Sequence, residues 1–370
     1  MTNAMANNLR VLIMAGGTGG HVFPALSVAE ELRERGAVVD WLGTGRGIEN
    51  RLVPAANIPL HLLKVEGVRG RGILGLIKAP FLVSFAVFQA VKLLRQIKPQ
   101  VVIGFGGFAS GPGGLAAKVL AIPLVIHEQN AVAGTTNRLL AKFAQRVLCA
   151  FPHAFKKGRV AVSAVVGNPV RKAIQDLPLV NVRYAARAAQ KAPLHLLVLG
   201  GSLGAKAINE LVPQALAELA PDNRPEVWHQ TGTSHQEGTA AGYAHYKVEG
   251  KVEAFIDDMA SAYAWADMVI CRAGALTVSE IMMAGVASVL IPLPSAIDDH
   301  QTWNAKNLTE AGAGIAVAQA DLSAAKLAAL LLTQFADRNH LMVMAEKARE
   351  LAQANSAAQV ADSCVEVALG

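Results

Sequence analysis

The chain has 370 residues, 52% of them hydrophobic, with a formal net charge of +6 and a pI of about 9.3. This length exceeds one ordinary hydrophobic core and favours two domains, while a charged fraction of only 17% excludes a largely disordered chain. The basic balance favours an anionic partner, but there is no long Lys/Arg run and aromatic residues make up only 5%, so nucleic acid is disfavoured as a partner.

The three cysteines, Cys149, Cys271 and Cys364, are widely separated. They form no C-x-x-C motif and no metal-binding spacing, which indicates a reducing compartment. Residues 1–8 are polar and lack the pattern of a signal peptide.

The first half of the chain alternates short apolar strands with helical patterns. Strands are predicted at 9–15, 38–42, 101–103, 123–126 and 147–149. Helices are predicted at 23–35, 81–96, 114–120 and 135–143. This βαβ order predicts a parallel sheet with right-handed crossovers.

A glycine-rich loop, Gly16–His21, follows the first strand and opens a helix. Backbone N–H groups and the helix dipole at such a turn make an anion site, so phosphate or diphosphate contact is one interpretation and a plain tight turn is the other. His21 falls in the first helical turn, where the dipole disfavours imidazolium, so it is a candidate proton acceptor. A histidine that only caps or packs the loop is the alternative.

The same loop only partly matches a dinucleotide-binding fingerprint. The run Gly17–Val22 contains G-x-G but lacks the third glycine. Asp40 has roughly the spacing of a ribose-binding acid, yet it falls inside the predicted strand rather than at its end. An NAD-dependent oxidoreductase is therefore a weakened alternative that stays open.

Next along the chain, Ile73–Leu94 has the length of a membrane-spanning segment. Lys78 and Pro80 interrupt it, and Lys92 and Arg95 follow at helical spacing. Its composition is therefore poor for a spanning helix.

Two further constellations follow predicted strands of the first half. The glycine cluster Gly104–Gly114 indicates either close approach of the backbone to a ligand or a flexible connector. The polar run His127–Asn130 stands at the carboxyl end of a parallel strand, where such sheets bind ligands. We expect at least one of these four side chains to touch substrate and others to cap the next helix.

The segment 160–170, which has few charges and contains Gly167-Asn168-Pro169, is the predicted domain linker. After it the alternating scheme repeats. Strands are predicted at 194–199, 226–229, 268–271, 288–291 and 314–317, and the Ala-rich stretch 341–369 is predicted to be helical.

The second half contains its own strand-to-helix turns. Gly200–Ala205 is a second glycine-rich loop, and Cys271–Glu280 again joins a strand to a helix. Thr277 and Glu280 match a capping box; alternatively, the turn holds a phosphate while Glu280 accepts hydrogen bonds from a ribose diol. Gln301 and Asn304 are three residues apart and share a helix face.

The sequence contains no motif for metal-dependent or covalent catalysis. It lacks a D-x-D motif for a metal-bound diphosphate, a P-loop, a Ser-His-Asp nucleophile elbow and a cluster of metal ligands. At least one aspartate of each pair, Asp257-Asp258 and Asp298-Asp299, is expected to cap a helix. We therefore expect no cofactor and no metal site, with helix dipoles and N–H groups stabilising any leaving diphosphate.

Six segments taken together resemble one bacterial family. They are Gly16–His21, Gly106–Pro112, His127–Asn130, Gly167–Arg171, Gly200–Ala205 and Ala275–Glu280, in this order along nearly the whole chain. The family is that of the peptidoglycan lipid-intermediate N-acetylglucosaminyltransferases of the GT-B class. The resemblance implies an α/β fold of GT-B type, in which two Rossmann-like domains face each other across a cleft.

The implied reaction is an inverting transfer of GlcNAc from UDP-GlcNAc. The implied acceptor is the C4 hydroxyl of N-acetylmuramoyl-pentapeptide on undecaprenyl diphosphate. Residues 1–166 would form the acceptor domain and 167–351 the UDP-GlcNAc domain, with a C-terminal helix at about 352–370 packing back on the first. His21 would be the general base, and Glu128 would assist or orient it.

The resemblance also implies contacts for the donor. Glu280 would bind the ribose hydroxyls, and the backbone near Ile256 together with Arg171 would face the uracil. The other implied substrate-binding residues are Ser202, Ala275, Leu276, Thr277, Val278 and Ser279 at the diphosphate, Asn130 and Gln301 at the GlcNAc, and Thr18, Gly19 and Gly20 near sugar and phosphate.

Two positions depart from the family pattern. His300 precedes Gln301 where the family varies, so either residue is a candidate for the sugar contact. Phe108 stands where the family often has another aromatic, which removes a hydroxyl but keeps the ring.

The resemblance also gives the apolar stretch a role on the cytoplasmic face of the bacterial inner membrane, as a peripheral attachment. Part of Ile73–Phe88, flanked by Arg69, Arg71 and Lys78, is expected to insert while the cations meet anionic lipids. The alternative is a helix that packs on the core of its own domain. A UDP-GlcNAc 2-epimerase and a non-catalytic UDP-sugar or lipid-binding protein are the other functions that share these features.

Overall fold

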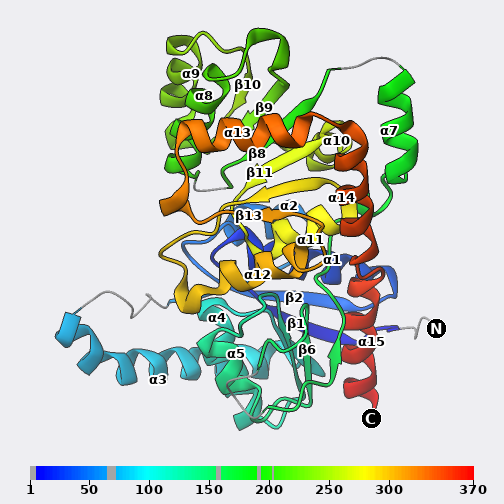
Figure 1. The fold of residues 1–370 in the computed structure, drawn as a ribbon. Coiled ribbons are helices and arrows are strands. Elements are labelled where there is room, and N and C mark those ends of the chain that lie inside the picture. Colours follow the sequence, from blue (N-terminus) through cyan, green and yellow to red (C-terminus); the bar gives the residue numbers. More distant parts are fainter. Residues whose placement is uncertain (1–5, 65–71, 156–159, 190–192, 202–203) are drawn as a thin grey trace. The chain divides into compact units, whose positions relative to one another are not determined.

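The computed structural model describes residues 6–64, 72–155, 160–189, 193–201 and 204–370, in two compact units (Figure 1). Unit 1 comprises Met1–Arg171 and Asn355–Gly370, and unit 2 comprises Lys172–Ala354. Each unit has a parallel sheet with helices packed on it, as the alternating pattern predicts. The domain limits 1–166 and 167–351 stay a prediction; contacts divide the chain slightly later at the linker.

Unit 1 is built on a seven-stranded sheet of order β3-β2-β1-β4-β5-β6-β7, in which neighbouring strands run parallel. The strands are β1 Arg10–Met14, β2 Val38–Thr44, β3 Leu60–Leu63, β4 Val101–Gly104, β5 Leu124–Glu128, β6 Arg146–Cys149 and β7 Ala164–Val165. The helices are α1 Gly19–Glu34, α2 Glu49–Ala55, α3 Gly72–Ile97, α4 Gly107–Val119, α5 Thr135–Leu140 and α15 Ser356–Leu369.

Unit 2 has a six-stranded parallel sheet of order β10-β9-β8-β11-β12-β13. The strands are β8 His195–Leu199, β9 Glu226–Gln230, β10 Lys251–Glu253, β11 Met268–Cys271, β12 Ala287–Leu290 and β13 Ile315–Ala316. The helices are α6 Lys172–Gln175, α7 Val180–Ala189, α8 Lys206–Ala217, α9 Gln236–His245, α10 Met259–Trp265, α11 Ala275–Ala284, α12 His300–Thr309, α13 Ala324–Phe335 and α14 Arg338–Glu350. Short 3₁₀ turns occupy Pro221–Asn223, Thr233–His235, Ile297–Asp299 and Gln319–Asp321.

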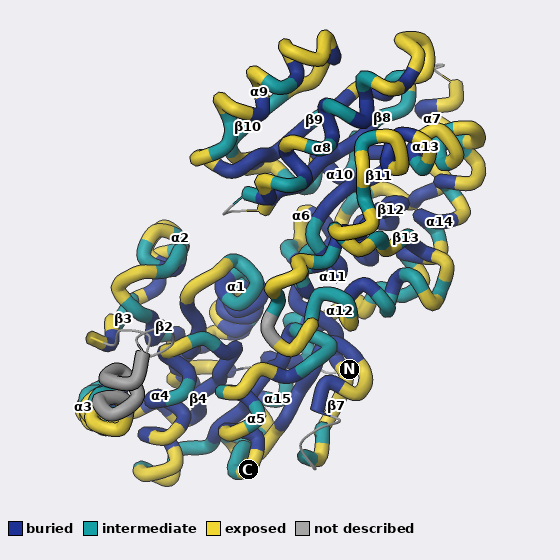
Figure 2. The backbone as a smooth tube through the Cα atoms, turned by 60° about the vertical axis from the view of Figure 1, so that its left-hand side comes forward, coloured by how far each residue is buried: buried dark blue, intermediate teal, exposed yellow. Residues whose placement is uncertain are grey.

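The central strands are buried on both faces because they are aliphatic throughout. Every residue of β4 and β11 is buried, and Figure 2 shows buried backbone along the central strands with exposed residues on the outer helix faces. Continuous Val, Leu and Ile runs with helices on both sides are what parallel sheets require.

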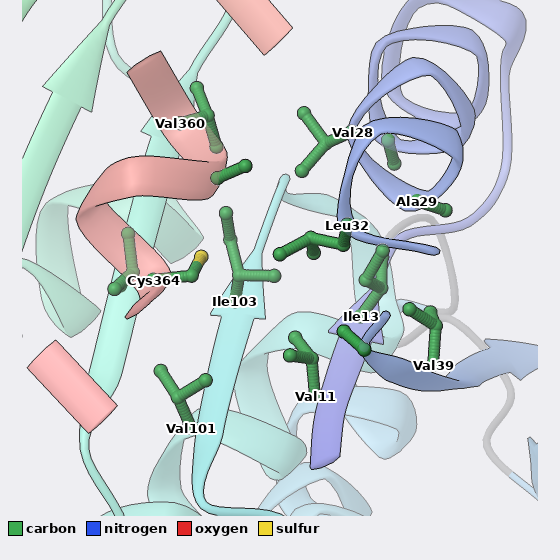
Figure 3. Close-up of a cluster of buried hydrophobic side chains, with 14 of the residues drawn as sticks. Val11, Ile13, Val28, Ala29, Leu32, Val39, Val101, Ile103, Val360 and Cys364 are labelled. Atoms are coloured by element: carbon green, nitrogen blue, oxygen red, sulfur yellow. The ribbon is translucent and has the colours of Figure 1, made fainter. Parts of the chain in front are cut away.

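The C-terminal helix α15 completes the core of unit 1. In Figure 3, Val360 and Cys364 of α15 and Leu32 of α1 converge on Ile103 of β4. Arg35, at the end of α1, is 3% exposed; its guanidinium contacts the Asp362 carboxylate and donates to the Ala358 carbonyl oxygen at 3.2 Å. The chain end is therefore part of the first unit.

Three sequence-based expectations need correction. The stretch 341–369 is not one helix, because α14 ends at Glu350 and α15 begins at Ser356 after Asn355, which has a positive φ of 61°. The predicted linker 160–170 contains strand β7. The glycine cluster after β4 is not a flexible connector, since helix α4 begins at Gly107 within it.

The strand order also locates the ligand edge of each sheet. Strand order reverses beside β1, between β1 and β4, and again beside β8, between β8 and β11. Doubly wound sheets bind ligands in the crevice at the carboxyl ends of such strands. The loops that follow β1 and β4, and those that follow β8 and β11, are therefore the places where a site is expected.

Candidate functional site

In unit 1 the first glycine loop leads directly into α1. Gly17 has a φ of +96°, which a residue with a side chain rarely adopts, and Thr18 is the N-cap of α1. The His21 N–H donates to the Thr18 carbonyl oxygen at 3.2 Å, within the first helical turn. The structure thus places Thr18, Gly19, Gly20 and His21 together at a helix N-terminus.

The loop after β4 lies against the first loop. A Cβ added at Gly106 would lie 3.2 Å from both Cδ2 and Nε2 of His21, so the ring packs over this glycine. A Cβ added at Gly107 would lie 2.7 Å from the carbonyl oxygen of Gly16. Gly106 and Gly107, in the loop after β4, are therefore required for this close approach. The next residue, Phe108, is 53% exposed.

Glu49 is a site-forming residue that the sequence analysis missed. Its carboxylate is 0% exposed and accepts a hydrogen bond from the Gly17 N–H at 2.9 Å and from the Thr44 N–H at 3.1 Å. No motif marks this glutamate, and its only sequence signal is its place just after the glycines at 43, 45 and 47.

Glu128 ends strand β5 and is 2% exposed. Its Oε1 accepts from the Asn130 N–H at 2.9 Å, and its Oε2 accepts from the Gly134 N–H at 3.0 Å and from Asn137 Nδ2 at 2.9 Å. With both oxygens occupied by the loop that follows β5, this carboxylate is arranged to orient that loop and Asn130.

His127 holds the chain that leaves unit 1. Its Nε2 donates to the Gly167 carbonyl oxygen at 2.9 Å, and its Nδ1 accepts from Gln129 Nε2 at 3.1 Å. Burial lowers the pKa of His127 to about 4, so the ring is neutral. Asn168 Nδ2 also donates to the Gln129 carbonyl oxygen at 3.1 Å, which fixes the Gly167-Asn168 segment against β5.

Arg171 lies at the end of that segment, in unit 1. Its guanidinium carbon is 5.1 Å from the centre of the Phe23 ring on α1, a cation–π contact. The predicted contact with uracil stays a prediction for this residue.

In unit 2 the N-terminus of α11 lies at the carboxyl end of β11. Gly274 is its N-cap, with no side-chain cap, and the Ser279 hydroxyl donates to the Ala275 carbonyl oxygen at 3.0 Å. The helix dipole places partial positive charge at the half-buried Leu276 and Thr277. The side chain of Val278 is fully buried in the core, so a ligand at this turn would meet the backbone of Val278 and not its side chain.

The strand-to-helix turn before α11 is rigidly held. Arg272 donates to the carbonyl oxygens of Ile291 and Pro292 at 3.1 and 3.3 Å, and to Gln319 Oε1 at 2.6 Å. Asn304, 0% exposed on α12, donates to the Ala273 carbonyl oxygen at 3.1 Å. These bonds leave little freedom to the turn that an anion would meet.

Glu280 lies in the second turn of α11 and is 5% exposed. Its Oε2 accepts from the hydroxyl of Tyr263, a fully buried residue of α10, at 3.1 Å. The predicted capping box of Thr277 and Glu280 is wrong, because α11 begins at Ala275 with Gly274 as its N-cap, so Thr277 already lies inside the helix. Tyr263 as the partner of Glu280 had no signal in the sequence.

The second glycine loop, after β8, is also held by a side chain. The Gly201 N–H donates to Gln230 Oε1 at 3.0 Å, and Gln230 Nε2 donates back to the Gly201 carbonyl oxygen at 3.0 Å. Gly201 has a φ of +76°. Ser202, predicted at the diphosphate, lies outside the described residues.

The remaining predicted donor contacts lie in unit 2. Gln301 Oε1 accepts a hydrogen bond from the Leu293 N–H at 2.9 Å. This bond fixes the side-chain amide of Gln301 and thereby orients its Nε2. His300, half-buried, begins α12 directly before it. Ile256, which follows β10, is 3% exposed, so its backbone rather than its side chain would contact the uracil base.

Several alternative chemistries find no support in the described residues. Asp40 lies mid-strand in β2 and pairs with His61 at 2.7 Å, so it does not serve as a ribose acid. Asp258 caps α10, as predicted for that aspartate pair. Burial raises the pKa of the Cys149 thiol to about 11 and that of Cys271 to about 12. Among the residues described, no three His, Cys, Asp or Glu side chains gather as a metal site would require.

A cavity of about 1100 Å³ lies elsewhere on unit 2, lined by Trp228, Lys251 and Trp265 among others. It is at the amino ends of β9 and β10, whereas the glycine loops follow the carboxyl ends. We therefore do not assign it to the site.

Comparison with known proteins covers both units. Residues 11–149 match the family model described as Glycosyltransferase family 28 N-terminal domain, and residues 195–363 match Glycosyltransferase family 28 C-terminal domain. A protein of Cellvibrio japonicus is 67% identical over 362 residues, which is 98% of this chain and 99% of the relative. Its name is UDP-N-acetylglucosamine--N-acetylmuramyl-(pentapeptide) pyrophosphoryl-undecaprenol N-acetylglucosamine transferase.

A protein of the same name from Stutzerimonas stutzeri is 54% identical over 97% of this chain and 99% of its own length. Among solved structures, Acinetobacter baumannii MurG aligns with a TM-score of 0.81 at 44% identity, covering 97% of this chain and 99% of that one. Anabaena Alr3699/HepE in complex with UDP and glucose aligns with a TM-score of 0.63 at 16% identity, over 96% and 99% of the two chains, a likeness of fold alone.

Proposed function

The chain belongs to glycosyltransferase family 28, and from this premise we propose that its two units provide the acceptor and donor sites of one sugar transfer. The enzyme transfers N-acetylglucosamine from UDP-GlcNAc to N-acetylmuramoyl-pentapeptide carried on undecaprenyl diphosphate. The 67% identity to a full-length relative named for this reaction carries the conclusion. The fold class, α/β of GT-B type with two Rossmann-like domains, is confirmed.

We assign the donor to unit 2. The N-terminus of α11 would receive the diphosphate at Ala275–Ser279, because its dipole and N–H groups favour an anion. Glu280, held through one oxygen by Tyr263, would accept from the ribose hydroxyls with the other. Ile256 and Arg171 are proposed at the uracil, and Gln301 or His300, with Asn130, at the sugar.

We assign proton removal to His21. The acceptor hydroxyl would give its proton to His21 while its oxygen forms a bond to the anomeric carbon of GlcNAc. The bond from that carbon to the diphosphate oxygen breaks, and the electron pair leaves with UDP, which inverts the configuration. Glu128 would not take the proton; it would orient Asn130 through the bonds described above.

Helix α3 is the proposed membrane contact. Its stretch Pro80–Ile97 is long and apolar enough to cross a membrane, and 17% of it is buried. Ala90 and Leu94 pack into the core of unit 1, so this face is already occupied by protein. Phe81, Phe85 and Phe88 are exposed on the rest of the helix.

This division of faces favours a helix that lies on the membrane rather than one that spans it. Lys92 and Arg95, both exposed on α3, would meet anionic headgroups. The flanking Arg69 and Arg71 lie outside the described residues, as does the side chain of Lys78. We propose peripheral attachment to the cytoplasmic face of the inner membrane.

The test of the function combines binding with turnover. UDP and UDP-GlcNAc should raise the thermal midpoint whereas NAD should not, because only a ligand of the folded state stabilises it. UDP release should then require the lipid-linked acceptor. Stabilisation by NAD alone would indicate a dehydrogenase, and UDP release without acceptor would indicate an epimerase or a hydrolase.

A further inference from the structure

The buried carboxylate of Glu49 fixes the conformation of the first glycine loop. Its Oε2 accepts from the Gly17 N–H at 2.9 Å, and its Oε1 accepts from the N–H and hydroxyl of Thr44 at 3.1 and 3.0 Å. The Ile48 N–H also donates to the Gly17 carbonyl oxygen at 3.2 Å. Both polar groups of the Gly17 backbone are therefore held by the short segment that begins α2.

The space for this carboxylate is made by three glycines: Gly16 after β1, Gly43 within β2 and Gly47 after β2. A Cβ added at Gly16 would lie 2.5 Å from Glu49 Oε1, and one added at Gly43 would lie 2.9 Å from Glu49 Cγ. A Cβ at Gly47 would overlap the carboxylate itself. An ionised carboxylate that accepts backbone N–H bonds makes stronger hydrogen bonds than a neutral acceptor. A side chain at any of these three glycines would therefore crowd the Glu49 side chain.

The loop that Glu49 holds carries the proposed base. Three residues separate Gly17 from His21, and the His21 ring packs over Gly106. The loop is therefore held by two other segments, through the bond of Glu49 to Gly17 and through the packing of Gly106 and Gly107 against His21 and Gly16. Because Gly17 needs a positive φ, a released loop has other backbone conformations to adopt.

Unit 2 repeats the arrangement independently. Its second glycine, Gly201, also has a positive φ and also gives its N–H to a side chain, Gln230. In both units, therefore, a distant side chain accepts a hydrogen bond from the N–H of the second glycine of the loop.

We propose that Glu49 is a positioning residue of the transfer reaction, which acts through Gly17 to place His21 against the acceptor hydroxyl. This inference rests on the proposed role of His21 as the base. Loss of the Gly17 bond would displace the proton acceptor, and with it Thr18–Gly20 near the sugar, while the donor contacts of unit 2 stay in place, so it would reduce kcat far more than it changes donor affinity.

The decisive variant is Glu49→Gln, which keeps the size of the side chain but turns one acceptor oxygen into a donor. We expect kcat to fall roughly ten- to hundredfold, since a displacement of about 1 Å in a reacting group has that effect, with the KM for UDP-GlcNAc changed by less than about threefold. Thr44→Val is the matched control: it removes one bond to the same carboxylate but leaves the Gly17 bond, and it should keep kcat within about threefold.

Gly17→Ala provides a second route, because its Cβ meets no atom within 4 Å while its φ of +96° becomes strained. It should reproduce the kcat loss, and the double variant should be no worse than the poorer single variant, since both act on one hydrogen bond. Additive losses, equal losses in Glu49→Gln and Thr44→Val, or full activity of Glu49→Gln would each overturn the inference. If His21→Ala keeps full turnover, the proposed base fails instead, which separates the two failures.

Discussion

At the residue scale, the site depends on buried polar side chains that act on other residues. Glu49, Glu128 and Gln230 each fix a loop, and Tyr263 fixes Glu280. Each of these groups is buried, so its hydrogen bonds are strong and the loss of one partner is costly. Such residues determine where the substrate-facing backbone lies.

Tyr263 provides a prediction on donor binding. Tyr263→Phe removes the hydroxyl that holds Glu280 Oε2, so the carboxylate should turn away from the ribose and the KM for UDP-GlcNAc should rise roughly five- to twentyfold with kcat nearly unchanged. Steady-state kinetics at saturating acceptor measure both constants.

Tyr184→Phe is the matched control for that experiment. Tyr184 is also buried, and its hydroxyl donates to the Asp267 carbonyl oxygen at 3.0 Å rather than to Glu280. The control should lose stability without a change in KM. An equal rise in KM in both variants would show that the effect is general and not due to Glu280.

His127 predicts a pH dependence of stability. Burial lowers the pKa of His127 from 6.5 to about 4. Between these pH values the ring is protonated in the unfolded chain but neutral in the native protein, so the free energy of unfolding falls as the pH falls. From pH 7 to pH 5 this one ring should account for a loss of about 2 kcal/mol.

Denaturant titrations of the wild type and of His127→Asn at pH 7 and 5 measure that loss. The wild type should lose more stability than the variant over this interval, because the variant lacks the titrating ring. Equal losses would contradict a neutral, buried His127. His229, whose pKa burial lowers to about 3, is unchanged in both proteins and cancels in the comparison.

At the element scale, the proposed role of α11 depends on the contacts at its two ends, and that of α3 depends on which of its faces is buried. The last carbonyl oxygens of α11, those of Met283 and Ala284, accept from Arg349 and Arg183, which complements the negative end of the helix dipole and leaves the positive end at the proposed diphosphate. Helix α3 has one face in the core of unit 1 and the other exposed.

The exposed face of α3 predicts membrane binding. Phe81 and Phe85, one helical turn apart, are 78% and 54% exposed. Changing both to serine should weaken binding to anionic vesicles at least about tenfold, since each inserted phenylalanine contributes roughly 1.5–3 kcal/mol. Flotation at low salt measures the bound fraction, and added salt should reduce it further because Lys92 and Arg95 are cations.

The control is a second apolar pair that lies far from α3 in the chain. Leu179 and Val182 beside and within α7 are 63% and 55% exposed. Their double change to serine should leave flotation unaltered. If the Phe81/Phe85 variant floats as well as the wild type, the membrane role of α3 is wrong.

At the scale of the whole molecule, the chain leaves unit 1, builds unit 2 and returns to unit 1 as α15. The return is held by apolar packing and by Arg35, whose side chain contacts both Glu31 and Asp362. Unit 1 is therefore complete only when the last helix has docked.

This closure predicts the effect of its ion pair. Asp362→Asn should lower the free energy of unfolding by about 1–3 kcal/mol, because it weakens a charge-assisted bond to a buried guanidinium. Glu366→Gln, which removes an exposed partner 4.0 Å from Arg146, should cost less than about 0.5 kcal/mol. Calorimetry of both variants checks the difference, and equal effects would show that the Arg35 pair does not hold α15.

Much of the fold follows from local patterns. Aliphatic runs and glycine turns correctly predict strands β1, β2, β4, β5, β6, β8, β9, β11, β12 and β13. The short edge strands β3, β7 and β10 were missed because two to four residues carry no periodic signal. The composition-based prediction of one helix over 341–369 missed the break between α14 and α15 because its Ala-rich surroundings have uniform helix propensity, whereas the resemblance implied a separate helix at about 352–370.

The sequence by itself determined the α/β class, the two glycine loops at the carboxyl ends of strands, and the family with its reaction, because these depend on local composition and on ordered motifs. The tertiary structure alone decided which distant side chains hold those loops: Glu49 lies 32 residues from Gly17, and Gln230 lies 29 residues from Gly201. The physical reason is that parallel strands bring the loops of separate βα units to one edge of the sheet, where a partner is chosen by position in space and not by spacing in the chain.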